Sequence, residues 1–244
     1  MSEWFKEWFN SEEYLEVYKH RNSSDAEKLL RLIFDNINLP KDSEILDAAC
    51  GAGRHSILLS EKGFNVTGFD LSDTLLKIAE KSAEEKKVQI DFQKADIRNF
   101  STDKKFSMIV NLFTSFGYFD SDEENFQFYK NIFPSLNKDG YLVFDYFNSK
   151  YLIKNLVPEN SKLVGDLTIF ENRSIKNERV VKNIRIVKNG FEKEFSESVK
   201  LYEKEKIIRK FEEIGYKIVN IFGNFNGDAF NEDVSERLII ICQK

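Results

Sequence analysis

Apolar strand-like segments alternate with helix-like segments along residues 43–147, and this alternation is the strongest constraint on the fold. The strand-like segments are 43–47, 64–70, 88–96, 105–113 and 140–147. The helix-like segments between them are 54–63, 72–87 and 122–136. Parallel strands need long crossover connections, which are usually helices. The order therefore predicts an α/β protein with a mostly parallel sheet covered by helices on both faces.

After Asn148 the pattern changes. Three strand-like runs follow without helices between them, at 162–171, 178–188 and 191–202. The last two runs are joined by Asn-Gly, which favours a tight hairpin turn. A helix at 204–215 and strands at 216–223 and 236–244 then return. We predict a small antiparallel sheet inserted into the main one.

The N-terminal part is predicted to be helical. Aromatic and apolar side chains recur at helical spacing over residues 4–18, and a second apolar stripe follows a serine cap in residues 23–37. We therefore expect helices ahead of the sheet.

Composition restricts the class of protein. The chain has 244 residues, a formal net charge of −5 and two cysteines, Cys50 and Cys242. A disulfide framework is therefore not expected, and the net charge disfavours a duplex nucleic-acid partner. No apolar run approaches the roughly 20 residues that span a bilayer, and the N-terminus lacks the pattern of a signal peptide. We expect a cytoplasmic protein with no membrane partner, as a monomer or homodimer.

The stretch "EILDAACGAGRHS", residues 44–56, places a glycine-rich turn between a strand and a helix. A dinucleotide fingerprint requires a third glycine at the position of Ser56, and a phosphate-binding loop requires Gly-Lys-Ser/Thr. Both are missing. The turn is thus predicted to bind a nucleotide-like ligand without a phosphate.

Three acids support that interpretation. Asp47 precedes the glycines, and Asp70 and Asp96 end the next two strands. The carboxyl ends of parallel strands form one edge of a sheet, where ligands bind. These carboxylates would repel a pyrophosphate but suit an ammonium, a ribose diol and an exocyclic amine. S-adenosyl-L-methionine carries all three groups.

These segments resemble a known family. "ILDAACGAGRHSILLSEKGFNVTGFDLSDTLLKIA" resembles the first two motifs of class I S-adenosylmethionine-dependent methyltransferases. "FQKADIRNF" and "FSMIVNLFTSFGYF" are similar to later motifs of that family. The resemblance implies a Rossmann-like, doubly wound, seven-stranded sheet. The N-terminal helices and the insert resemble those of small-molecule members such as aminosugar N-methyltransferases.

The resemblance also implies roles for single residues. Asp47 supports the glycine loop and the amino end of the donor, and the backbone of Ala49, Gly51 and Gly53 approaches the donor. Asp70 binds the ribose hydroxyls beside Leu71. Asp96 accepts from the adenine amine, and the Ile97 N–H meets the ring. Asn111 and Leu112 line the methionine end.

The acceptor side has fewer candidates. Tyr18, His20 and Tyr118 are candidate catalytic residues, because a hydroxyl or imidazole can orient or deprotonate an acceptor. Arg21 is expected near the donor. His55 is a second histidine candidate, although a lone histidine is more often structural. We expect no metal, because no histidine and carboxylate cluster is visible.

Three regions are expected. Residues 1–148 would be a helical lid plus the donor-binding core, 149–202 an antiparallel insert over the substrate, and 203–244 the end of the core. The predicted activity is methyl transfer to nitrogen or oxygen of a small-molecule acceptor. Alternatives are an RNA-modifying methyltransferase that uses the basic insert, a non-catalytic donor-binding module and a nucleotide-dependent oxidoreductase.

Overall fold

The structure is a computed structural model of the 244-residue chain, and it describes all residues except 1–2, 19–22 and 189. In chain order the elements are α1 (Trp4–Trp8), α2 (Glu12–Val17), α3 (Ser23–Asn36), β1 (Glu44–Ala48), α4 (Arg54–Glu61), β2 (Asn65–Asp70), α5 (Asp73–Lys86), β3 (Ile90–Lys94), β4 (Phe106–Asn111), α6 (Asp122–Ile132), a 3₁₀ turn (Phe133–Ser135), β5 (Leu136–Phe147), α7 (Ser149–Lys154), β6 (Glu159–Val164), β7 (Leu167–Lys176), β8 (Arg179–Lys188), β9 (Phe191–Lys200), α8 (Lys204–Ile214), β10 (Lys217–Phe222) and β11 (Arg237–Gln243).

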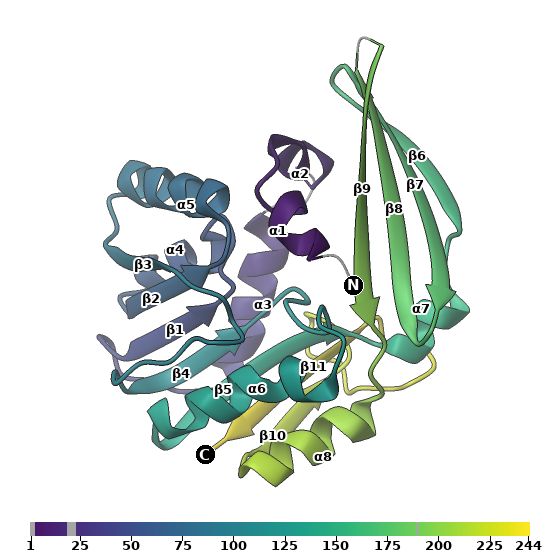
Figure 1. Cartoon of the computed structure of the whole chain (residues 1–244). Helices are drawn as coiled ribbons and strands as arrows, with labels where there is room; N and C mark the ends of the chain where they lie inside the picture. Colours follow the sequence, from purple (N-terminus) through teal and green to yellow (C-terminus); the bar gives the residue numbers. More distant parts are fainter. Residues whose placement is uncertain (1–2, 19–22, 189) are drawn as a thin grey trace.

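The strands of the described chain form two separate sheets (Figure 1). The larger one has the order β10-β11-β5-β4-β1-β2-β3. Strands β1 to β5 run parallel, and β11 runs antiparallel to both β5 and β10. The predicted α/β fold with a mostly parallel seven-stranded sheet and a small antiparallel sheet is confirmed.

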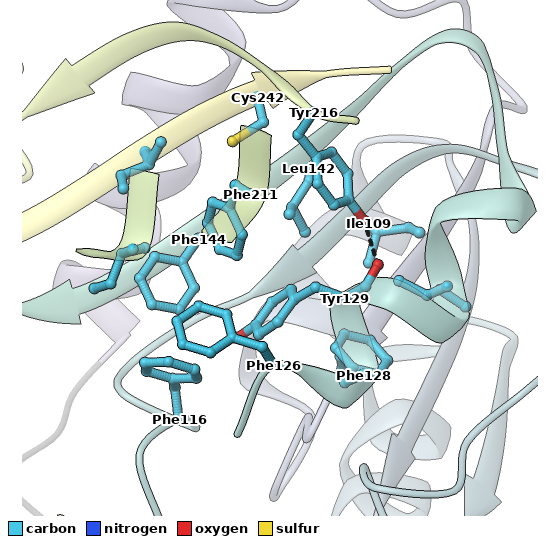
Figure 2. Packing of buried hydrophobic residues seen from close by; sticks show 14 of the residues in the cluster. Ile109, Phe116, Phe126, Phe128, Tyr129, Leu142, Phe144, Phe211, Tyr216 and Cys242 are labelled. Atoms are coloured by element: carbon cyan, nitrogen blue, oxygen red, sulfur yellow. Dashed lines mark hydrogen bonds between the residues drawn. The ribbon is translucent and has the colours of Figure 1, made fainter. Parts of the chain in front are cut away.

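Helices cover both faces of the larger sheet. On one face, α3 and α4 bury Leu29, Ile33 and Leu59 against Ile45 of β1 and Met108 of β4. On the other face, an aromatic cluster packs α6 and α8 on the sheet (Figure 2). This cluster includes Phe126, Tyr129, Phe144, Phe211 and Tyr216. The buried Tyr216 hydroxyl donates a hydrogen bond to the carbonyl of Tyr129 over 2.9 Å, so its hydrogen-bonding capacity is satisfied inside the cluster.

The inserted sheet has the order β6-β7-β8-β9 and is antiparallel throughout. The sequence predicted three strands here, and this was wrong. The run 162–171 reverses direction at Gly165, which has a φ of +59°, a value that glycine adopts readily. The run therefore contributes to both β6 and β7. The residues on both sides of Gly165 are apolar, which hid the turn in the sequence.

Two short helices occupy the N-terminal part that was predicted to be one helical region. Helix α1 ends at Trp8, and Ser11 starts α2 by accepting a hydrogen bond from the Tyr14 N–H over 3.2 Å. Both helices lie between α5 and the inserted sheet (Figure 1). Trp8 packs on Phe195 of β9 with ring centroids 4.5 Å apart. The N-terminal helices therefore join the two sheets.

Among the residues that the structure describes, no helix combines the length and apolar character needed to cross a membrane.

Candidate functional site

A cavity of about 420 Å³ lies where the carboxyl ends of the parallel strands meet the N-terminal helices. Such a volume is in the range of small-molecule sites. Its walls come from the loops after β1, β2, β3 and β4, from α1 and α2, and from β9. The strand ends converge here because β1, β2, β3 and β4 are parallel neighbours. The lining residues that the sequence had singled out are Tyr18, Asp47, Ala49, Gly51, His55, Asp70, Leu71, Asp96, Ile97, Leu112 and Tyr118.

The glycine turn after β1 is built from left-handed residues. Ala49, Gly51 and Gly53 have φ values of 55°, 56° and 75°. A Cβ on Gly51 would meet only Leu75, at 3.9 Å, so this side of the turn is open to the cavity. A Cβ on Gly53 would lie 2.8 Å from that of Ala79, and Gly53 does not line the cavity. Gly53 therefore serves the packing of α4 against α5, while Ala49 and Gly51 face the cavity.

Asp70, at the end of β2, is held by backbone donors on both oxygens. The Gly51 N–H donates to Oδ2 over 2.8 Å, and the Ser72 N–H donates to Oδ1 over 2.9 Å. Burial raises the pKa of this carboxyl, against the effect of these two hydrogen bonds. The carboxylate is thus fixed in one orientation beside the glycine turn.

Asp47 lies deeper, on β1. The Ser56 hydroxyl donates to its Oδ2 over 2.5 Å. Burial raises the pKa of Asp47 to about 7. The group is therefore close to half-ionised near neutral pH, and a nearby cation would favour its charged form.

Asp96 follows β3 and pairs with Arg98. The guanidinium donates to both carboxylate oxygens, with Nη2 2.6 Å from Oδ2 and Nε 3.0 Å from Oδ1. Burial disfavours the charged carboxylate, but Arg98 outweighs this effect and lowers the pKa of Asp96. Ile97 lies beside it in the cavity wall.

Asn111 and Leu112, at the end of β4, are placed differently from each other. Leu112 lines the cavity, whereas Asn111 does not. The Asn111 side chain is fully buried, donates to the Ala48 carbonyl over 3.0 Å and accepts from the Tyr129 hydroxyl over 2.7 Å. Its amide thus ties β4 to β1 and α6.

The loop after β4 is strained. Phe113 and Thr114 both line the cavity with left-handed backbones, at φ values of 54° and 67°. The side-chain carboxylate of Asp145 accepts from the Phe113 N–H over 2.8 Å, and the backbone carbonyl of Asp145 accepts from the Thr114 N–H over 3.1 Å. Strain of this kind persists only where surrounding contacts enforce it, and it is common at functional sites. Asp145 does not line the cavity itself and instead holds the loop through these two hydrogen bonds.

Tyr118 lies farther along the same loop, within an aromatic wall. Its ring centroid is 5.1 Å from that of Trp4 and 5.8 Å from that of Phe9. Its hydroxyl donates to the Thr114 carbonyl over 2.8 Å. Trp4 and Phe9 of the N-terminal segment thus form an aromatic wall together with Tyr118.

Tyr18 faces the inserted sheet as well as the cavity. Its hydroxyl donates to Glu197 of β9 and accepts from Lys182 of β8, whose Nζ lies 2.7 Å away. Glu197 also lines the cavity and was not among the sequence candidates. The signal that could have found it is its position between Phe195 and Val199 on the same face of one strand.

The histidine and arginine candidates have different outcomes. His20 and Arg21 lie outside the described residues. His55 is buried at the start of α4, and its Nε2 has no hydrogen-bond partner among the residues the structure describes. Burial lowers the pKa of His55 to about 3, so the ring is neutral at physiological pH. The described residues contain no group of three or more His, Cys, Asp or Glu side chains arranged to hold a metal ion.

The N-terminal segment closes over the Asp70 side of the cavity. The Ser72 hydroxyl donates to the Phe9 carbonyl over 2.7 Å and lies 2.9 Å from Asn10 Oδ1. The Thr74 hydroxyl donates to the Asn10 carbonyl over 3.1 Å. The turn between α1 and α2 is thus attached to the start of α5.

Comparison with known proteins gives matches in sequence and in fold. Residues 45–140 match a family described as a methyltransferase domain. A putative methyltransferase of Bacillus subtilis, YqeM, is 34% identical over 125 residues, which are 51% of this chain and 50% of that protein. A Streptomyces venezuelae protein named dTDP-3-amino-3,4,6-trideoxy-alpha-D-glucopyranose N,N-dimethyltransferase is 33% identical over 85 residues, 35% of this chain and 34% of that one. The matches thus span half or less of these relatives.

Solved structures match over nearly the whole chain. An S-adenosylmethionine-dependent methyltransferase from Clostridium acetobutylicum aligns with a TM-score of 0.81 at 21% identity, covering 95% of this chain and 97% of that one. DesVI of Streptomyces venezuelae aligns with a TM-score of 0.69 at 20% identity, covering 93% and 95%. At such identities the similarity establishes the fold, including the inserted sheet that lies within the aligned length.

Proposed function

We propose, because residues 45–140 match a family described as a methyltransferase domain, that this chain is an S-adenosyl-L-methionine-dependent methyltransferase acting on nitrogen or oxygen of a small-molecule acceptor. We assign residues 1–148 to a helical lid and the donor-binding core, residues 149–202 to the insert that covers the acceptor, and residues 203–244 to the end of the core.

The observation that carries this proposal is the carboxylate of Asp70, fixed at the cavity wall by the N–H groups of Gly51 and Ser72. Each oxygen accepts one of these donors, and an ionised carboxylate has about four acceptor positions. Acceptor positions therefore remain for the hydroxyls of a ribose. A fixed carboxylate suits a diol and would repel a phosphate.

Other residues of the cavity fit the rest of the donor. Asp47 would favour an ammonium, because a nearby cation stabilises the charged form of a buried carboxyl. Asp96 would accept from the adenine amine, with Leu71 and Ile97 as apolar contacts for the ring. Leu112 would contact the methionine end. The backbone of Ala49 and Gly51 lets these groups approach closely.

When bound, S-adenosyl-L-methionine supplies a methyl group on a positively charged sulfur for direct displacement. The residues of this chain would hold the acceptor in line with that group, and orientation of this kind lowers a barrier by about 7–11 kcal/mol. The aromatic wall of Trp4, Phe9 and Tyr118 would keep water out and attract a positive charge. Tyr18 and Tyr118 would orient the acceptor. His20 is a further candidate catalytic residue, and Arg21 is a candidate for binding the donor.

The similarity to relatives supports a small acceptor. The Streptomyces venezuelae relative is named for a dTDP-linked amino sugar. The cavity of about 420 Å³ is lined in part by two N-terminal helices and by β9, and a cavity of this size supports a small acceptor rather than a macromolecule.

Thermal unfolding tests the proposal. The wild-type chain and Asp70→Ala are heated with excess S-adenosylmethionine, S-adenosylhomocysteine or NADH. A ligand at 100 times its Kd stabilises by about 2.7 kcal/mol, which raises Tm by roughly 5–10 °C for a chain of this size. We expect this rise with the two sulfur compounds, and its loss in Asp70→Ala.

Asp73→Ala is the matched control, because Asp73 is an exposed carboxylate three residues away that pairs only with exposed Lys94 in the described structure. This variant should keep the rise. A rise with NADH alone, or none with either sulfur compound, would overturn the proposed function.

A further inference from the structure

We infer that Arg98 is a positioning residue that orients the Asp96 carboxylate for adenine and connects it to the N-terminal lid. The inference rests on the proposed function, since it takes the donor's adenine as the group that Asp96 meets. Arg98 is not among the residues that line the cavity. Its influence on the donor must therefore pass through the groups that it contacts, Asp96 and the N-terminal segment.

The guanidinium of Arg98 contacts both oxygens of Asp96 through two nitrogens, in a fork-shaped arrangement. Nη2 donates to Oδ2 over 2.6 Å, Nε lies 3.0 Å from Oδ1 and 3.1 Å from Oδ2, and the backbone N–H of Arg98 donates to Oδ1 over 2.9 Å. Two-point contacts of this kind fix the plane of a carboxylate as well as its position. A lysine at this position would supply charge but no fork.

These donors leave capacity on the carboxylate. Three N–H groups of Arg98 donate to the carboxylate, and Nε is shared between its two oxygens, so one of its roughly four acceptor positions stays available. The remaining one suits a single amine hydrogen, which is what the 6-amino group of adenine offers. A 6-keto purine would instead bring its own acceptor atom against the carboxylate. Asp96 held by Arg98 should therefore distinguish the two bases.

The same guanidinium contacts the lid. Its Nη2 lies 2.9 Å from Glu3 Oε1, just ahead of α1, and its Cζ lies 5.8 Å from the centroid of Phe5 on α1. It also lies 4.9 Å from the ring of Phe119, on the loop after β4. The Arg98 side chain is 24% exposed, so it lies at the rim, where the lid closes over the adenine side. Arg98 thus joins Asp96 to the N-terminal segment and to the loop after β4.

Calorimetry with two ligands tests the inference without knowledge of the acceptor. Binding of S-adenosylhomocysteine is compared with binding of its 6-keto counterpart, S-inosylhomocysteine, for wild type, Arg98→Met, Arg98→Lys, Glu3→Gln and Lys94→Met. The wild type should prefer the adenine compound by about ten- to a hundredfold, the worth of a hydrogen bond to a charged group. In Arg98→Met and Arg98→Lys this preference should fall toward one.

Glu3→Gln separates the two roles of Arg98. It removes the contact with the lid and keeps the fork, so the preference should stay as in wild type. The affinity for S-adenosylhomocysteine should fall by up to about fivefold, the range expected for an exposed ion pair. Lys94→Met removes an exposed cation near the end of β3 and should change neither quantity.

The outcomes are distinguishable. If wild type binds S-adenosylhomocysteine and the Arg98 variants keep its full preference for adenine, the inference is wrong and the proposed function stands. An equal loss of affinity for both ligands would also overturn the inference, since it indicates a merely structural role. If wild type binds neither compound, the proposed function fails and the inference fails with it.

Discussion

Asp145 and Arg237 form an ion pair beneath the loop after β4, with Arg237 Nη2 2.8 Å from Asp145 Oδ1. Arg237 Nη2 also lies 3.0 Å from the Thr114 hydroxyl, and the second oxygen of Asp145 accepts from the Phe113 N–H. The pair therefore joins β5 and β11 to the two left-handed residues of the cavity wall. It explains how the loop keeps a strained shape.

Replacing Arg237 by methionine should destabilise the chain strongly. Asp145 is 0% exposed, and burial already raises its pKa, so the variant leaves a buried carboxylate without its cation. Removing one partner of a buried pair costs about 3–5 kcal/mol, and we expect the lower end because Arg237 is partly exposed. Urea unfolding at pH 7 measures this loss. The control is Arg209→Met, on the exposed side of α8, which should change the free energy of unfolding by less than about 0.5 kcal/mol. Equal losses in both variants would contradict a stabilising role for the Asp145–Arg237 pair.

The raised pKa of Asp47 predicts that its contribution to folding stability decreases as pH rises. Its pKa is about 7 in the folded chain because of burial, against an ordinary value of 3.8. The folded state then holds a proton that the unfolded state has released, so this group's contribution to stability falls as pH rises from about 4 to about 7. One pKa unit corresponds to about 1.4 kcal/mol, which makes the total about 4 kcal/mol.

Asp47→Asn isolates that contribution, because its amide stays neutral throughout. Urea unfolding of both proteins at intervals between pH 4 and pH 8 gives the difference in unfolding free energy. We expect the difference to shift in favour of the variant as pH rises, whereas the other carboxyl groups act alike in both proteins. A pH-independent difference would show that the Asp47 pKa is not raised.

Alanine substitutions at two glycines with positive φ distinguish the cost of backbone strain from the cost of side-chain crowding. Gly165→Ala places a methyl group where nothing lies within 4 Å, so only the left-handed backbone is penalised, by about 1–2 kcal/mol. Gly53→Ala adds a clash with Ala79 at 2.8 Å, and overpacking costs a further 1–3 kcal/mol or so. Denaturant unfolding of both variants measures the difference. Equal losses would mean that α4 and α5 move apart at little cost.

Lys182 should hold the N-terminal helices on the inserted sheet. Its Nζ lies 3.2 Å from Glu171, 3.6 Å from Glu197 and 2.7 Å from the Tyr18 hydroxyl. Lys182→Met removes one cation from the buried Glu171, which keeps its ion pair with Arg173, so we expect a loss below the roughly 3 kcal/mol of a fully broken buried pair. Limited proteolysis should then cut the region of α1 and α2 sooner than in wild type. Lys188→Met, which removes an exposed cation of the same strand, should leave the cleavage pattern unchanged.

The strand–helix alternation and the ends of the parallel strands were predictable from the sequence. Asp70 illustrates why. The polarity pattern locates the end of β2 within a few residues, and parallel connectivity brings that end to the same edge as the glycine turn. Asp47 and Asp96 reach the cavity for the same reason. Local periodicity and connection length are enough for such placements.

Other parts of the site depended on contacts between distant segments. Glu197 lines the cavity because β9 of the inserted sheet packs on α1. Asn111 does not line the cavity because its side-chain amide is bound by Tyr129, on another element. The turn at Gly165 was missed because apolar residues continue on both sides of it.

By itself, the sequence determined the α/β class, the glycine turn and the row of acids at the strand ends, because short-range periodicity and parallel crossovers dictate them. Only the tertiary structure decided which cation meets an acid from a distant strand. Asp96 pairs with its sequence neighbour Arg98, but Asp145 pairs with Arg237, which lies on a strand 92 residues further along the chain. Such pairings follow from the order of strands and the packing of side chains, and neither leaves a local pattern in the sequence.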